Sequence, residues 1–130
     1  MKEDIKKDIE RAESAIKSAE RNLRENDIFT AANRSFVACE NSVYVLLKLK
    51  YGSSPISRIK ILTKLGEIDK KGKEVYDRSY DLRVQSDYGR EANVLPLNKE
   101  NMEKTLNDVK KVLENAKKLF AEKYDKKGDE

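Results

Sequence analysis

Four polar-tipped side chains share one face of a helix predicted over residues 73–87, which overlaps the stretch "SYDLRVQSDYG" (79–89). They follow one another at spacings of four, three and four residues: Tyr76, Tyr80, Arg83 and Asp87. That spacing places them on one side of an α-helix, and Tyr88 follows directly. A guanidinium can bind a phosphate through two parallel hydrogen bonds, which a lysine cannot do. The face is therefore a candidate site for the phosphate of a nucleotide or of RNA.

A structural interpretation competes with this one. Arg83 and Asp87 can form an ordinary i,i+4 ion pair worth about 0.2–0.5 kcal/mol. The tyrosines can bury their rings and leave their hydroxyls in water. Both interpretations remain open at the level of the residues.

A local excess of positive charge precedes this helix. The chain has a net charge of +4, whereas residues 48–73 hold eight Lys or Arg against two Asp or Glu and so carry +6 by themselves. Such an excess favours contact with a phosphate backbone or an acidic partner, and Lys60 and Lys64 are the candidate phosphate contacts. A solvated lysine-rich surface is the alternative.

Several site classes are excluded by composition. The chain has no histidine, which removes His-ligated metals, His-based triads and the usual proton shuttle near neutral pH. Asp4 and Asp8 fit a solvated i,i+4 pattern on a helix surface, so we expect no metal and no cofactor. The single cysteine, Cys39, is predicted to be a small buried hydrophobe.

The apolar pattern indicates helices throughout. The first and last helices carry stripes with spacings of 4, 3, 4, 3 and 4 residues, and no stretch alternates as a strand would. The fold class predicted is all-α, an antiparallel, up-and-down bundle of four or five helices in one domain over 1–124, followed by a frayed charged tail, 125–130. The helices are expected at 3–25, 27–51, 55–65 (after Ser54 as N-cap and ended by Gly66), 73–87 and from Asn98 onward.

The helix over 27–51 carries two faces. One is apolar and includes Phe29 and Phe36. The other is more polar and includes Asn33, Glu40 and Tyr44, which we expect to support the site, with Glu40 opposite Arg83.

No apolar run approaches the ~20 residues that a membrane span needs, and the N-terminus is charged from its second residue, without an apolar leader. We expect a cytoplasmic protein with no membrane contact.

At the level of whole segments, the chain resembles the HEPN domain proteins, in particular the small UPF0332-type members of archaea and bacteria. The resemblance rests on three segments: "AERNLRENDIFTAANRSFVACENSVYVLLKLKYG" (19–52), "YDLRVQSDYG" (80–89), which is close to a family signature LRxxADYG, and the closing helix after "LNKENMEKTL".

The resemblance implies a helical bundle that forms a homodimer. It also implies a partner, a small nucleotidyltransferase antitoxin of the minimal (MNT) type, for members that act as ribonuclease toxins. Active relatives carry an R-x(4–6)-H motif, in which the Arg steadies a phosphate and the His moves the proton of the RNA 2′-hydroxyl. Carried over to this chain, the Arg is Arg83 and the His position holds Tyr88.

That replacement weakens the case for catalysis. An ordinary phenol, with a pKa near 10, is ionised to about one part in a thousand at pH 7, which would cost a base roughly 4 kcal/mol. Asp87 is a candidate substitute, but an ordinary carboxylate is a weak base for a hydroxyl. Val84 also stands where active relatives often have a polar residue.

Three hypotheses follow. The chain is a HEPN-like module that binds RNA, nucleotide or a nucleotidyltransferase partner and is weak or inactive as a nuclease. Alternatively, it is a metal-independent ribonuclease toxin that uses Arg83 with Tyr88 or Asp87. The third possibility is a helical dimer with no ligand, in which the polar face is structural.

Overall fold

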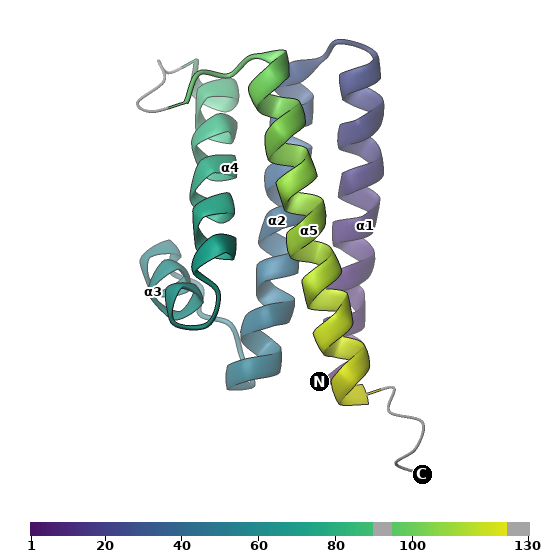
Figure 1. Cartoon of the computed structure of the whole chain (residues 1–130), viewed down its shortest axis with the longest axis vertical. Helices are drawn as coiled ribbons and strands as arrows, with labels where there is room; N and C mark the ends of the chain where they lie inside the picture. Colours follow the sequence, from purple (N-terminus) through teal and green to yellow (C-terminus); the bar gives the residue numbers. More distant parts are fainter. Residues whose placement is uncertain (90–94, 125–130) are drawn as a thin grey trace.

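The computed structural model describes residues 1–89 and 95–124, and these residues form helices and no strand. The elements are α1 (Lys2–Arg24), α2 (Ile28–Tyr51), α3 (Arg58–Ile68), α4 (Lys70–Tyr88) and α5 (Lys99–Tyr124). The four long helices run up and down side by side, and the short α3 lies beside the first turns of α4 (Figure 1). The prediction of an all-α bundle is confirmed. The predicted tail, 125–130, lies outside the described residues.

Helix α2 is the central element of the bundle. α1, α4 and α5 all pack against it, whereas α1 and α4 do not touch each other within the described residues. The predicted apolar stripes face this packing: Ile5, Ala12 and Ala19 of α1 are fully buried, as are Met102, Val109 and Ala116 of α5. Burial of these stripes supplies most of the stability of helices whose surfaces are otherwise charged.

The ends of the helices follow local chemistry. The Asp27 carboxylate accepts a hydrogen bond from the Thr30 backbone N–H at 3.1 Å and caps α2, which lowers the pKa of Asp27. Asn98 caps α5 in the same way through the Asn101 N–H at 2.8 Å. Gly52 ends α2 with φ +83°, a conformation that glycine adopts without strain. These three ends are where the sequence predicts them.

The predicted third helix is wrong at both ends. Its N-cap is Ser57, not Ser54, so Ile56 lies outside the helix and is 99% exposed. Gly66 lies within α3, where a side chain at that position would meet the aliphatic part of Lys73. The helix ends at Asp69, whose carboxylate accepts a hydrogen bond from the Gly72 N–H at 2.8 Å and so also begins α4.

Two large apolar side chains of the predicted helices lie on the surface. Phe29, assigned to the apolar face of α2, is 59% exposed, and Ile59 of α3 is 74% exposed. Phe29 sits in the first turn of α2, at the level where α4 ends, so little of α4 remains to cover it. On α3 the buried residues are Ile61 and Leu65, because that face turns toward α4.

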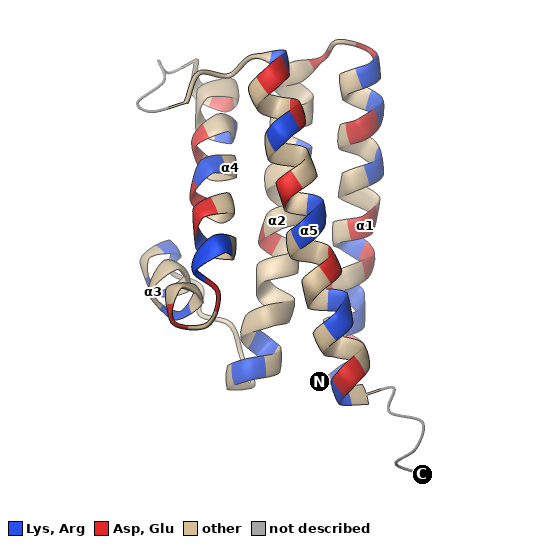
Figure 2. Ribbon diagram, in the orientation of Figure 1, with Lys and Arg blue, Asp and Glu red and all other residues tan. Residues whose placement is uncertain are grey.

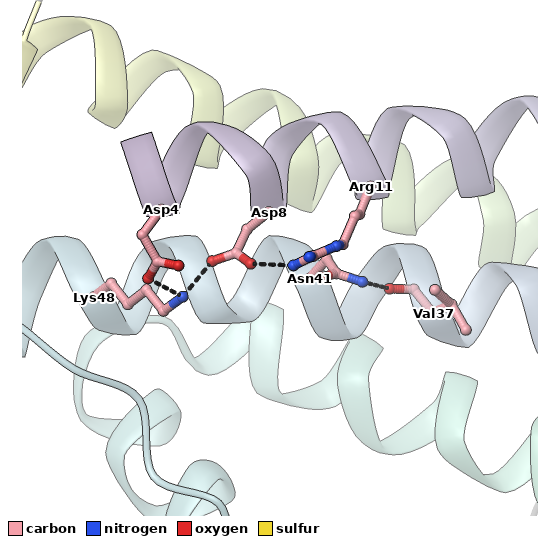
Figure 3. A network of polar contacts seen from close by, with 6 residues as sticks. All are labelled: Asp4, Asp8, Arg11, Val37, Asn41 and Lys48. Atoms are coloured by element: carbon pink, nitrogen blue, oxygen red, sulfur yellow. Dashed lines mark hydrogen bonds and ion pairs between the residues drawn. The ribbon is translucent and has the colours of Figure 1, made fainter. Parts of the chain in front are cut away.

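Asp8 is buried, contrary to the expectation of a solvated carboxylate. The Lys48 ammonium lies 2.6 Å from Asp8 and 2.7 Å from Asp4, and the Arg11 guanidinium lies 3.5 Å from Asp8 (Figure 3). Only 4% of the Asp8 side chain and 16% of the Lys48 side chain are exposed. Burial alone would lower the pKa of Lys48, but hydrogen bonds to both carboxylates raise it overall. The pair ties α1 to α2 across the bundle.

No helix within residues 1–89 and 95–124 combines the length and the apolar character needed to cross a membrane.

We predict that Lys48→Met lowers the free energy of unfolding by about 2 kcal/mol at pH 7, measured by urea denaturation. Breaking a fully buried pair costs about 3–5 kcal/mol, and here Arg11 still faces Asp8. Since the folded state raises the pKa of Lys48, the stabilisation is complete at neutral pH and is lost only as the pH rises through that raised value.

Two further variants control this measurement. The double variant Asp8→Asn/Lys48→Met should be more stable than Lys48→Met, because no unpaired charge stays buried. Lys117→Met removes a lysine whose pair with Glu13 is about 40% exposed, and it should cost under about 1 kcal/mol. Equal losses of stability for the two lysines would contradict a special role for Lys48.

Candidate functional site

Arg83 lies at the surface of α4 and is paired within its own helix. Its Nε donates to Asp87 Oδ2 at 3.0 Å, with 36% of the Arg83 side chain and 28% of the Asp87 side chain exposed. The guanidinium carbon also lies 5.3 Å from the centre of the Phe36 ring of α2. The i,i+4 pair is therefore present, and Arg83 rests on an aromatic ring without being enclosed.

An aromatic cluster of Phe36, Tyr76 and Tyr80 joins α2 to α4. The Phe36 ring centre lies 5.5 Å from that of each tyrosine, tilted toward Tyr76 and edge-on to Tyr80. On the far side of the cluster the Arg58 guanidinium stacks 3.9 Å from the centre of the Tyr80 ring. Two arginines therefore flank the cluster, and each is attracted by the face of a ring.

Tyr76 belongs to the core. It is 2% exposed, and burial raises the pKa of its phenol, with the nearby Glu40 carboxylate adding to the shift. A ligand arriving from solvent does not reach it. Tyr80 is half-buried and Arg83 is exposed in part, so of the four predicted residues Tyr80, Arg83 and Asp87 remain at the surface.

The end of α4 is fixed on two sides. Ser86 Oγ donates to the carbonyl oxygen of Phe29 at 2.8 Å, which binds this end to the start of α2. The buried amide of Gln85 donates to the Leu95 carbonyl at 2.7 Å and accepts from the Leu97 N–H at 2.9 Å. Arg83 is therefore presented by a well-held helix end. Sequence reasoning missed Gln85, since a lone glutamine carries no local signal of its partner.

Tyr88 is the last residue of α4 and is 71% exposed. Gly89 follows with φ +62° and turns the chain away. A ring so exposed can stack on a base.

The half-buried residues Asn33, Val37, Glu40 and Tyr44 form a strip of α2, which we call the α2 strip. It lies between α1 and α4, because the other sides of α2 are covered. The expectation that Glu40 opposes Arg83 is not met: the carboxylate paired with Arg83 is Asp87. Glu40 instead lies near two phenols, and burial together with Glu40 raises the pKa of Tyr44 to about 12. The Asn33 amide oxygen accepts from the Arg34 guanidinium at 2.8 Å.

Lys64 lies far from Arg83. Lys60 and Lys64 both belong to α3, and the Lys64 ammonium is 4.4 Å from the centre of the Tyr51 ring, at the end of α2. Tyr51 is about 22 Å along α2 from Phe36, at 1.5 Å per residue.

The basic excess of residues 48–73 is partly neutralised. Lys48 pairs with Asp4 and Asp8, and Arg58 pairs with Asp77 at 2.5 Å. Elsewhere both signs of charge are interspersed along α1, α4 and α5, whereas α2 is mostly uncharged (Figure 2). The role of Arg58 against Tyr80 could not be found from the sequence, because the two residues lie on different helices and no local pattern links them.

Within the described parts of the chain, no group of three or more His, Cys, Asp or Glu side chains is placed to hold a metal ion. Cys39 is fully buried, and this burial raises the pKa of its thiol to about 12. The prediction of a small buried residue is confirmed for Cys39.

Comparison with known proteins agrees with this geometry. The family model "HEPN domain" matches residues 5–119. The crystal structure of a protein from Sulfolobus solfataricus superposes with a TM-score of 0.68 at 18% sequence identity, covering 84% of this chain and 95% of that one. This similarity shows a shared fold. The search of curated proteins found no match.

The family match extends over all five helices and includes the segment that carries Arg83 and Tyr88. It supports a helical module related to nucleotides or RNA. By this match, the chain belongs to the HEPN domain family.

Proposed function

We propose that this chain is a HEPN module that binds the phosphate of RNA or of a nucleotide through Arg83, with little or no nuclease activity. The observation that carries the proposal is the position of Arg83: partly exposed, resting on Phe36, and held at a fixed helix end. Tyr88 and Tyr80 are the nearby rings on which a base can stack.

The ion pair with Asp87 does not prevent this binding. It is an exposed i,i+4 pair, worth about 0.3–0.5 kcal/mol. It engages Nε, and the structure records no hydrogen bond from the terminal nitrogens of Arg83 to the described residues. Those two nitrogens are the edge that binds a phosphate bidentately.

The alternative is a metal-independent ribonuclease of a toxin–antitoxin pair. It requires a group that accepts the proton of the 2′-hydroxyl. Tyr88 occupies the histidine position of active relatives, and Asp87 is already hydrogen-bonded to Arg83. Binding without efficient cleavage is therefore the better supported function.

A second candidate function is protein binding at the start of α3 and the residues just before it. Ile56 and Ile59 are 99% and 74% exposed, and neighbouring large apolar side chains at a surface often mark a protein interface. The partners implied by the family are a second copy of the chain and a minimal nucleotidyltransferase.

We expect Arg83→Ala to weaken binding of labelled single-stranded RNA about tenfold, the ~1.5 kcal/mol of one charged hydrogen bond. Fluorescence anisotropy of the RNA in the presence of EDTA measures the affinity of the parent and of the variant. Arg24→Ala, which removes an exposed arginine of α1, is the matched control and should change little. RNA cleavage in EDTA that disappears in a folded Arg83→Ala variant would establish the ribonuclease instead.

Asp87→Asn should strengthen RNA binding, whereas Arg83→Ala should weaken it. Removing the carboxylate frees the Arg83 Nε and takes a negative charge from the site, so RNA affinity should rise about two- to threefold, in line with a pair worth ~0.5 kcal/mol. Weaker binding by a folded Asp87→Asn variant would mean that the carboxylate itself serves the ligand.

For α3, we expect Ile56→Ser/Ile59→Ser to abolish binding of a minimal nucleotidyltransferase, measured by sedimentation velocity, and to leave RNA affinity unchanged. The two side chains make few contacts in the isolated bundle, so its unfolding temperature should stay within a few degrees of the parent. A complex of undiminished affinity would remove α3 as the docking surface.

A further inference from the structure

A hollow of about 490 Å³ lies between α1 and α2, on the side of the α2 strip away from Arg83. Its polar lining consists of Lys7, Glu10, Arg11, Ser14, Arg34 and Asn41. Three cations and one carboxylate give this lining a net charge of +2. We call it the α1–α2 hollow.

The cations of the α1–α2 hollow have unused binding capacity. The Arg34 guanidinium makes two hydrogen bonds, both to the neutral amide oxygen of Asn33, and neither Arg34 nor Lys7 forms an ion pair with the described residues. Arg11 reaches Asp8 at 3.5 Å with 64% of its side chain exposed, while Asp8 is already satisfied by Lys48 at 2.6 Å. By contrast, Arg78 of α4 forms a close ion pair with Asp108 of α5, at 2.9 Å.

The two arginines are also held in place. Arg34 is fixed by Nε and Nη2 on Asn33, which leaves Nη1 for a ligand. Arg11 is oriented by Asp8, and Asp8 is oriented by the half-buried Lys48 (Figure 3). Side chains that are already ordered lose less entropy when an anion binds. The Ser14 hydroxyl adds a further donor beside them.

We propose that the α1–α2 hollow is a second phosphate site for the RNA strand that Arg83 binds, so that one strand crosses the α2 strip from α4 to α1. This inference rests on the proposed function. The two sites lie on opposite sides of the same turn of α2, since Arg34 lines the hollow toward α1 and Phe36, two residues further on, contacts Arg83 of α4.

The distance between the two sites fits a short strand. Packed helices lie about 8–10 Å apart, so α1 and α4, on either side of α2, are at most about 20 Å apart. At ~3.4 Å per stacked nucleotide, about six nucleotides span that distance. A trinucleotide reaches only one site, whereas a dodecamer reaches both.

The test compares Arg11→Gln/Arg34→Gln with the parent protein, using fluorescein-labelled RNA of three and of twelve nucleotides at several salt concentrations. For each phosphate that the protein no longer neutralises, the slope of log affinity against log salt should fall by about 0.7. The double variant should therefore lower the slope by about 1.4 and weaken dodecamer binding about 25-fold at 0.1 M salt. Trinucleotide binding at Arg83 should be unchanged. Arg34→Gln alone leaves the Asp8 pairs intact and should give about half the change in slope.

The control is Lys6→Gln/Arg24→Gln, which removes two exposed charges of α1 outside the hollow and should leave the slope nearly unchanged. If the parent binds RNA but both hollow variants keep its slope, the second site is refuted and the proposed function stands. If the parent binds neither oligonucleotide, the proposed function itself fails. Loss of binding to a labelled hexaglutamate peptide, with RNA binding intact, would assign the hollow to an acidic protein partner and overturn the RNA site.

Discussion

The architecture depends on the packing of one helix. α2 is covered by α1, α4 and α5, and its apolar residues form the centre of the core. Because α1 and α4 do not meet within the part of the chain that the structure describes, a strip of α2 stays half-exposed between them. Each polar residue that we place in a site lies on this strip or beside it. The functional surface that we propose is therefore centred on the part of the central helix that the bundle leaves uncovered.

The aromatic cluster connects this surface to the core. Phe36 is buried, yet its ring touches a buried tyrosine, a half-buried tyrosine and the guanidinium of Arg83. Arg58 approaches the same cluster from α3. The polar face noticed in the sequence is thus partly structural, because Tyr76 fills the core, and partly accessible, because Arg83 and Tyr88 reach the solvent. The structural interpretation of that face is confirmed for the buried Tyr76 and for the Arg83–Asp87 pair, whereas phosphate binding by Arg83 stays a prediction.

The sequence predicts what depends on neighbours along one helix. The stripes of α1 and α5, the cap Asn98 and the pair Arg83–Asp87 all lie within four residues of their determinants, and the structure confirms them. Contacts between distant segments could not be predicted in this way: Lys48 and Asp8 are separated by 40 residues, and Arg58 and Asp77 by 19. The start of α3 is also predicted too early, since Ser54 and Ser57 are equally good caps and the path from α2 decides between them.

Asp69 has a consequence for how firmly α3 is attached to the bundle. It is both the last cap of α3 and the first cap of α4, so no spare residue separates the two helices. A single residue therefore ties the orientation of α3 to the first turn of α4. Arg58, in the first turn of α3, rests on Tyr80 and pairs with Asp77, which fastens α3 to α4 at a second point. The exposed Ile59 is thus carried by a helix that is anchored at both ends to the element that presents Arg83.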